Sequence, residues 1–481
     1  MVLVKPQSDQ VGKYILAAAA IAICPVAVWA ALGHGRIMTL ALVGALALTI
    51  GAYIGLRHPL WLYWALAVVL GALPFGYFPG VHVPMYLLFA GGAILAAIIH
   101  PSEQTKLTRL ENAVLLLILA SALSVVATGL SIPGLLLFAK WAIAAGMTVA
   151  LLRLSRENLA TFGRIFVVAA TANALSGIVM ATVDQEQRIL GPFRIFGYGI
   201  GAGLRENLAL FVYSDEGRSI GKTMRLGGTW ILPNSAGLAL VLAIILCLIL
   251  FRGWMRIGLT TIMTAALLLT LSRSMIFSVA IGLLLVLLFH SMRARDRQIA
   301  IGIAGLVAVG AFLTPAVRER IMSTFADNDV GREARTDSFA EFPGKMAGHW
   351  LFGLGWDRPE FRSGQLAQSL NYVSNAPLLT VYRGGIITGF LFVAVLVIGC
   401  VMAYRALRAE SLTNAIFGGM FIGIAVVSCN LQQSVVDMPQ MTLTFSVLLA
   451  FMVYVDQSSR PRPERPPAPA ATEEPLVSTA R

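Results

Sequence analysis

Apolar runs of about 20 residues recur along this chain, and they restrict its fold more than any other feature. A helix of this length crosses a hydrocarbon core about 30 Å thick. Backbone polar groups in lipid must be hydrogen-bonded within their own segment, so each run is expected to be a helix. We therefore predict an all-α, polytopic transmembrane helical bundle of about 12–14 spans. The expected spans are residues 14–33, 37–55, 59–79, 83–99, 110–128, 134–152, 159–182, 231–251, 256–271, 274–290, 298–316, 377–404, 411–430 and 440–456.

Composition excludes an ordinary soluble fold. Of the 481 residues, 57% are hydrophobic and 12% are charged, whereas soluble domains carry roughly 25% charged residues. The first run is about 20 residues long and many spans follow it, so we predict a retained helix rather than a secretory signal. The four cysteines form no CxxC pair, which indicates neither a disulfide framework nor a zinc site.

The distribution of basic residues explains the net charge of +12 without a nucleic-acid partner. With both termini in the cytoplasm, the inner loops contain twelve basic residues, whereas the short outer loops contain only Arg36 and Arg273. An excess of Lys and Arg in the inner loops sets the orientation of membrane proteins. The inner residues are Arg57, Lys106, Arg109, Arg153, Arg156, Arg252, Arg256, Arg293, Arg295, Arg297, Arg405 and Arg408.

This topology gives a single transmembrane domain, residues 1–456, with two long segments outside, residues 183–230 and 317–376. In so hydrophobic a chain, we expect a catalytic site in contact with water to lie in these long loops. Residues 457–481 include PRPERPPAPAATEEP, and this Pro- and Ala-rich composition predicts a disordered cytoplasmic tail.

The first long loop ends in a polar junction with the next span. Arg225 is followed by LGGTWILPNSAG, in which Gly227 and Gly228 permit tight backbone geometry. Pro233 marks the start of the helix, and Asn234 can cap that helix or hydrogen-bond a ligand hydroxyl. For the glycines alone, an ordinary loop-to-helix junction is the simpler interpretation.

Two cations lie where the membrane disfavours charge. Arg273, in LTLSRSMIF, occupies a turn so tight that it must lie close to the membrane. Lys140 lies inside the 134–152 span. An arginine or lysine at mid-bilayer costs roughly 2.5–3.5 kcal/mol on insertion scales, so it tends to mark a polar cavity or a function. The alternative for both residues is a side chain that extends along its apolar stem to the interface.

The second long loop carries a charged stretch, DNDVGREARTDSFAEF. Arg332 and Arg335 are three residues apart, so they share a face if this stretch is helical. Two guanidinium groups on one face can bind a diphosphate bidentately. A solvated charged face is the commoner use of such a run.

Several short motifs follow one another in this part of the chain. They are R-x-G-G-T…P-N-x-x-G from Arg225 to Gly237, L-S-R-S at 271–274, G-R at 331–332, F-G-x-G at 352–355, and S-N-x-x-L…G-G-x-x-T-G at 374–389. In order, spacing and predicted outer placement, these motifs resemble the bacterial O-antigen ligase / polysaccharide polymerase superfamily, whose members are integral membrane glycosyltransferases. The resemblance covers roughly residues 220–405.

The resemblance implies an enzyme of the bacterial inner membrane that transfers a glycan from undecaprenyl diphosphate to an acceptor hydroxyl at the periplasmic face. The diphosphate lipid is the leaving group, so the resemblance implies no nucleotide, no metal and no other cofactor. Positioned positive charge is usually the largest contribution to such transfers. We therefore assign catalytic roles to Arg225, Arg273 and Asn375. Substrate-binding roles are assigned to Lys140, Asn234, Arg332 and Arg335. The implied partners are the lipid-linked glycan, the lipid bilayer, chain-length regulators and export proteins, with no nucleic acid.

The chain departs from the superfamily pattern at one position. Members commonly have His-Asn where the last long loop returns to the membrane, and the histidine is a candidate base for the acceptor hydroxyl. This chain has Ser374-Asn375, while His349 lies elsewhere in the loop. We therefore predict a polymerase of O-antigen, capsule or exopolysaccharide repeat units, with an O-antigen ligase as the alternative. A transporter or flippase and a non-catalytic membrane scaffold are the other classes considered.

Overall fold

The computed structural model describes residues 51, 53–79, 83–100, 106–184, 188–198, 211–213, 220–313, 315–322, 330–358, 373, 375–431 and 434–459. The predicted span 14–33, nearly all of 37–55, and the predicted tail beyond Ser459 lie outside these residues.

Every other predicted span coincides with a helix, which confirms the all-α fold of a polytopic membrane protein. These helices are α3 (Pro59–Ala72), α4 (Met85–Ile99), α5 (Arg109–Ala127), α6 (Ile132–Leu152), α7 (Arg156–Thr182), α8 (Pro233–Leu250), α9 (Gly253–Leu269), α10 (Arg273–Phe289), α11 (Ala294–Leu313), α14 (Ala376–Leu407), α15 (Leu412–Gly423) and α18 (Pro439–Ser459). Within the described residues, six of them are long and apolar enough to cross a membrane, namely α5, α6, α7, α8, α14 and α18.

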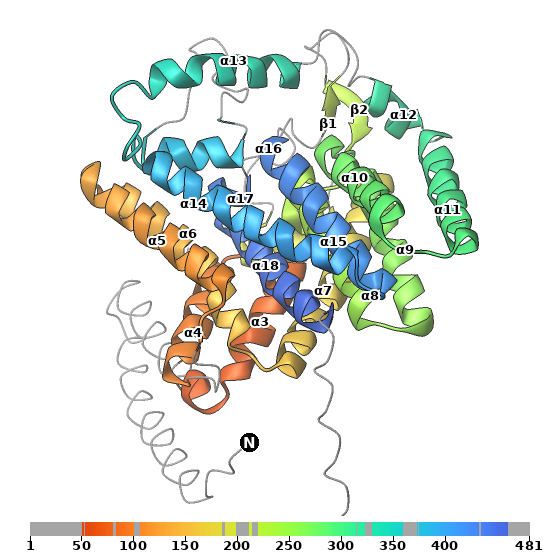
Figure 1. Ribbon diagram of the computed structural model, residues 1–481, viewed down its shortest axis with the longest axis horizontal. Helices are drawn as coiled ribbons and strands as arrows, with labels where there is room; N and C mark the ends of the chain where they lie inside the picture. The colour runs from red at the N-terminus through yellow and green to blue at the C-terminus, as the bar shows by residue number, and fades with distance from the viewer. Residues whose placement is uncertain are drawn as a thin grey trace, which may run out of the picture.

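The two long loops contain short elements of their own. They are a 3-10 helix (Arg188–Phe196), the antiparallel pair β1 (Phe211–Tyr213) and β2 (Ile220–Met224), a second 3-10 helix (Gly228–Trp230), α12 (Pro315–Met322) and α13 (Val330–Lys345). Figure 1 shows α13 and the β1–β2 pair at the same end of the helix bundle. We call this end of the bundle, where α8, α10 and α14 begin, the loop face.

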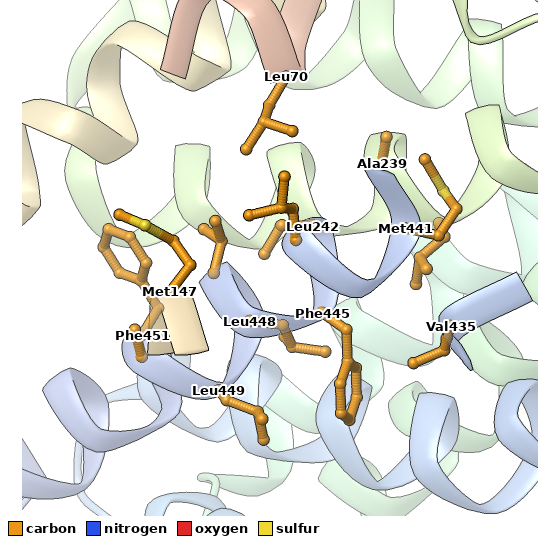
Figure 2. Packing of buried hydrophobic residues seen from close by; sticks show 14 of the residues in the cluster. Leu70, Met147, Ala239, Leu242, Val435, Met441, Phe445, Leu448, Leu449 and Phe451 are labelled. Atoms are coloured by element: carbon orange, nitrogen blue, oxygen red, sulfur yellow. The ribbon is translucent and has the colours of Figure 1, made fainter. Parts of the chain in front are cut away.

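Two central helices form the core of the bundle. In the most apolar window of α18, 83% of the residues are buried against other helices, and in α8 the share is 78%. Figure 2 shows side chains of α18, among them Phe451, Leu448 and Phe445, in one buried cluster with Leu242 of α8 and Met147 of α6. The surrounding helices keep large apolar side chains exposed, as lipid contact requires. Leu119 of α5 and Phe390 of α14, which are 56% and 72% exposed, are examples.

Basic residues gather at the end of the bundle opposite the loop face. Arg153 at the end of α6 pairs with Glu111 in the first turn of α5. Arg405 near the end of α14 pairs with Asp456 near the end of α18, with 3.2 Å between Nε and Oδ1. These contacts place several of the predicted inner cations at one shared end, as the topology requires.

Two neighbouring helices are discontinuous near the loop face. Gly385 interrupts α14 with φ 83° and ψ 176°, so its first turns form a separate segment. After α15 the chain passes through a π-helix (Ile424–Ser428) and the short helices α16 (Cys429–Leu431) and α17 (Ser434–Asp437) before α18 begins. The uninterrupted spans predicted over 377–404 and 411–430 are wrong in this respect, because periodicity cannot locate a break at a glycine or a widened turn.

Candidate functional site

The segment that follows β2 is inserted into the bundle instead of lying on it. Trp230 is fully buried and Thr229 is 3% exposed. The Thr229 backbone N–H donates to Asn173 Oδ1 at 3.1 Å, and its hydroxyl donates to the Ala72 carbonyl at 2.5 Å. Gly228 has φ 55°, and a Cβ there would lie 2.8 Å from Asn173 Oδ1. The glycine is therefore required at this position, and the junction is more than an ordinary connection.

Arg225, just before this segment, binds the turn between α9 and α10. Its Nε donates to the Thr270 carbonyl at 2.9 Å and its Nη2 to the Leu271 carbonyl at 3.5 Å. These carbonyls lie at the negative end of the α9 dipole, where a cation is stabilised. Arg225 is only 8% exposed. Its guanidinium therefore holds the turn that presents the L-S-R-S motif.

Asn234 joins the two adjacent motifs through its side-chain oxygen. Asn234 Oδ1 accepts from Arg225 Nη2 at 3.1 Å and from Ser272 Oγ at 2.9 Å. Of the two alternatives considered for Asn234, the helix cap does not occur, because Leu232 occupies the N-cap of α8 and no side chain caps that helix. The side chain is instead directed across to the α9–α10 turn. The residue is exposed, so its amide nitrogen can meet a ligand.

The starts of α8 and α10 form one positively polarised surface. Neither helix has a side-chain cap, since Ser272 donates to Asn234 and does not bind the first-turn N–H groups of α10. The first N–H groups of a helix have no partner within the helix, and they favour anions. Gly237 lets the two helices approach, because a Cβ there would lie 2.7 Å from Met275 Cγ. Arg273 is the first residue of α10 and is partly buried.

We call Arg225, Asn234, Ser272 and Arg273 the cationic cluster. The Arg225 guanidinium, Arg273 at the first position of α10 and the two uncapped helix starts lie around one turn. This arrangement suits a multiply charged anion such as a diphosphate. The structure therefore brings together three of the residues predicted from the sequence.

Asn375 caps α14 and connects it to the discontinuous part of the neighbouring helix. Its Oδ1 accepts from the Leu378 N–H at 2.9 Å, and its Nδ2 donates to Asn430 Oδ1 at 3.1 Å. Asn430 Nδ2 in turn donates to the Val426 carbonyl of the π-helix at 2.7 Å. Asn375 is 7% exposed, whereas Asn430 is exposed. Asn375 therefore lies where the chain returns to the membrane, at the start of α14. Its hydrogen-bond partner Asn430 was not among the residues predicted from the sequence.

Arg383 and Asp437 form an ion pair that the sequence interpretation did not single out. Arg383 Nη2 lies 2.5 Å from Asp437 Oδ1, and Nη1 donates to the Val436 carbonyl at 3.3 Å. The guanidinium also lies over the Trp356 ring, 5.3 Å from its centroid. A charge inside an apolar span was the available signal. In the sequence analysis VYRGGIITG was interpreted only through its glycines, so Arg383 was overlooked.

The F-G-x-G motif is seated on the interrupted part of α14. The Leu354 N–H donates to the Tyr382 carbonyl at 2.8 Å, and the Ile386 N–H donates to the Trp350 carbonyl at 2.8 Å. Ser124 Oγ of α5 donates to the Phe352 carbonyl at 2.5 Å. The interruption of α14 exposes backbone groups that the loop satisfies, so the two glycine motifs form one unit.

Replacing Gly385 by alanine is expected to prevent folding. A Cβ at this residue would lie 1.9 Å from the Leu351 carbonyl oxygen, and the positive φ adds roughly 1–2 kcal/mol of strain. Fluorescence-detected size exclusion of a tagged Gly385→Ala variant should show little monodisperse protein. Gly258→Ala in α9 is the matched control, because nothing lies within 4 Å of its added Cβ. Equal recovery of both variants would contradict the seating of the loop on α14.

The remaining predicted residues are not joined to the cationic cluster by a described contact. Lys140 is partly buried in α6, which packs on α4, α5 and α18. Arg332 and Arg335 lie in α13, so the helix on which their shared face depends is present. Their side chains lie outside the described part of the structure. Within the described residues, no three His, Cys, Asp or Glu side chains gather in a way that could hold a metal ion.

Comparison with known families agrees with the resemblance seen in the sequence. Residues 258–393 match the family model described as O-antigen ligase. No curated protein sequence matches the chain. The matched residues contain Arg273, Arg383 and Asn375 and run from α9 to the interrupted α14. The match supports the resemblance to the O-antigen ligase / polysaccharide polymerase superfamily and, in general, an O-antigen ligase or polymerase type of function in the membrane.

Proposed function

We propose that this protein is an inner-membrane glycosyltransferase that polymerises undecaprenyl-diphosphate-linked oligosaccharide repeat units at the periplasmic face. The cationic cluster carries the proposal. A transfer that releases a diphosphate develops negative charge on the leaving group, and fixed positive charge lowers the barrier to it. Arg273 and the uncapped starts of α8 and α10 supply that charge, while Arg225 fixes the turn on which Arg273 stands.

The acceptor would approach from the side of Asn375 and Asn430. Amide side chains donate and accept hydrogen bonds but do not take a proton at neutral pH. Their contribution would therefore be orientation of the acceptor hydroxyl relative to the departing diphosphate, which can itself be worth a large factor in rate. Lys140, Arg332 and Arg335 are proposed to bind outlying charge of the donor.

A strain that lacks the gene distinguishes a polymerase from an O-antigen ligase by the lipid-linked intermediate that accumulates. We expect single lipid-linked repeat units to accumulate, because a polymerase joins them. Full-length unligated chains on the lipid would instead identify an O-antigen ligase. Glycan profiles and lipid-linked intermediates, resolved by electrophoresis and mass spectrometry, separate these outcomes, and a plasmid copy of the wild-type gene must restore the parental pattern.

A transporter or flippase is the second candidate, because discontinuous helices are typical of transporters. In transporters, however, such breaks occupy corresponding positions of two repeats. Here the breaks lie in α14 and in the segment between α15 and α18, which adjoin in sequence and in space. Glycan transfer by the purified protein in detergent, where no compartments exist, would exclude transport as its sole activity.

The proposed site requires the loop face to be periplasmic. Glu341 of α13 and Glu410 between α14 and α15 are both exposed and lie at opposite ends of the bundle. In cells with a permeabilised outer membrane, Glu341→Cys should react with an impermeant thiol reagent, and Glu410→Cys should react only after lysis of the inner membrane. A cysteine-free parent protein gives the background. The reverse pattern would place the cationic cluster in the cytoplasm and refute the proposed reaction.

A further inference from the structure

A segment between α16 and α18 touches both sides of the proposed site. At one end, Asn430 accepts from Asn375, the residue that caps α14 where the long loop ends. At the other end, Asp437 pairs with Arg383, and the Met438 sulfur accepts from Ser235 Oγ at 3.8 Å. Ser235 directly follows Asn234 of the cationic cluster. The segment therefore connects the cationic cluster to Asn375, although α8 and α14 are far apart in sequence.

The ion pair lies at the point where both discontinuous helices change direction. Arg383 directly precedes the Gly384-Gly385 interruption of α14, and Asp437 precedes the start of α18. The side chains of Arg383 and Asp437 are 11% and 25% exposed. Two interrupted helices have fewer backbone hydrogen bonds to fix their ends than continuous ones. Backbone hydrogen bonds to the F-G-x-G loop hold the interruption of α14. The ion pair and the Arg383 hydrogen bond to the Val436 carbonyl join this part of α14 to the segment before α18.

The chemistry of the pair suits orientation better than stability. Removing two charges from water offsets much of their attraction, so an apolar pair of similar volume often stabilises a protein as well. A guanidinium that binds both a carboxylate and a backbone carbonyl accepts few geometries. The Trp356 ring, which packs against Trp141 with 5.0 Å between centroids, restricts Arg383 from a further direction.

We infer that Arg383 and Asp437 are positioning residues for glycan transfer. Their ion pair holds the first segment of α14, and with it Asn375, at a fixed position relative to the cationic cluster. This inference rests on the proposed function, since it assigns the pair a place in that same site. Neither residue needs to touch the substrate.

The test uses the purified full-length protein in nanodiscs with a lipid-linked repeat unit as donor. Arg383→Glu and Asp437→Arg should each lower kcat by roughly 100-fold, the effect of a misplacement of about 1 Å. KM for the donor should change little, because the cationic cluster keeps its own contacts. The charge-swapped double variant, Arg383→Glu with Asp437→Arg, should recover most of kcat. Rescue by the swap is a result that simple loss of packing would not give.

Arg405 and Asp456 provide the matched control at the opposite end of the bundle, where a similar ion pair joins α14 to α18. Arg405→Glu should lower the melting temperature, because it breaks this ion pair, and the folded fraction should keep the wild-type kcat. A second readout does not need activity. Cysteines at Ser235 and Met438 should be joined readily by a short thiol crosslinker in the parent background and much less readily with Arg383→Glu.

Normal kcat and normal crosslinking in both single variants would overturn the inference, while transfer by the wild type would leave the proposed function intact. If the wild type transfers no glycan, the proposed function fails, and the crosslinking yields still decide whether the pair sets the position of the segment. If the single variants do not fold, the double variant and the milder Asp437→Asn decide. Asp437→Asn removes the charge of the pair and should lower kcat. A folded double variant with full crosslinking and a kcat well above that of Asp437→Asn supports positioning. A double variant whose kcat is as low as that of Asp437→Asn refutes it.

Discussion

Arg273→Ala is expected to abolish glycan assembly in cells while the amount of protein in the membrane stays normal. Arg273 begins α10, beside the uncapped start of α8 and next to Ser272, which binds Asn234. Loss of one positioned group that stabilises developing negative charge typically lowers kcat roughly 100- to 1,000-fold. Arg273→Lys should recover little, because lysine keeps the charge but loses the planar fork that binds two oxygens at once. Polymer formation at matched expression is the measurement.

The control for Arg273 is Arg252, an arginine near it in sequence that lies at the opposite end of the bundle. Arg252, just before α9, is exposed and is not part of the cationic cluster. Arg252→Ala should therefore leave polymer formation unchanged. Normal polymer from Arg273→Ala would mean that its side chain only extends to the interface, and the diphosphate site would then have to be sought elsewhere. If the Arg273→Ala protein fails to accumulate in the membrane, Arg273 is instead needed for folding.

The helices were predictable from the sequence because lipid imposes a strong and simple requirement. A run that must satisfy its own backbone groups is a helix whatever its neighbours are. The predicted span 134–152 and α6 (Ile132–Leu152), for example, differ by two residues at the start and by none at the end. Where α14 is interrupted, the deciding fact is a contact with Leu351, more than thirty residues earlier in the chain. Hydropathy contains no information about such a contact.

The candidate site was predictable to the extent that its residues stand next to glycines and prolines in short motifs. Arg225, Asn234 and Arg273 were found in this way, and the structure joins them through Asn234 and the turn at Leu271. Asp437 was not found, because it lies in no motif and only the folded chain brings it to Arg383. Of the two roles considered for Asn234, capping does not occur, since a residue at a helix start is a cap only if its side chain turns back to its own backbone.

Asn375→Ala is expected to lower transfer by roughly 100-fold in a protein that still folds. The substitution removes the cap of α14, which costs about 1 kcal/mol, and also the hydrogen bond to Asn430. Asn375→Ser separates the two effects, because a serine hydroxyl can cap the helix but is too short to bind Asn430. We expect Asn375→Ser to restore stability and not activity, measured as melting temperature and as kcat of the purified protein.

The same experiment tests whether a histidine has taken over as the base for the acceptor hydroxyl. His349 is exposed in the turn between α13 and Trp350, and its backbone N–H is held by the Met346 carbonyl at 2.9 Å. Its imidazole is not needed if orientation by Asn375 and charge from Arg273 carry the reaction. His349→Gln should therefore keep wild-type polymer formation at matched expression. An inactive His349→Gln protein beside an active Asn375→Ala protein would move the base to His349, and Asn375 would then be a helix cap alone.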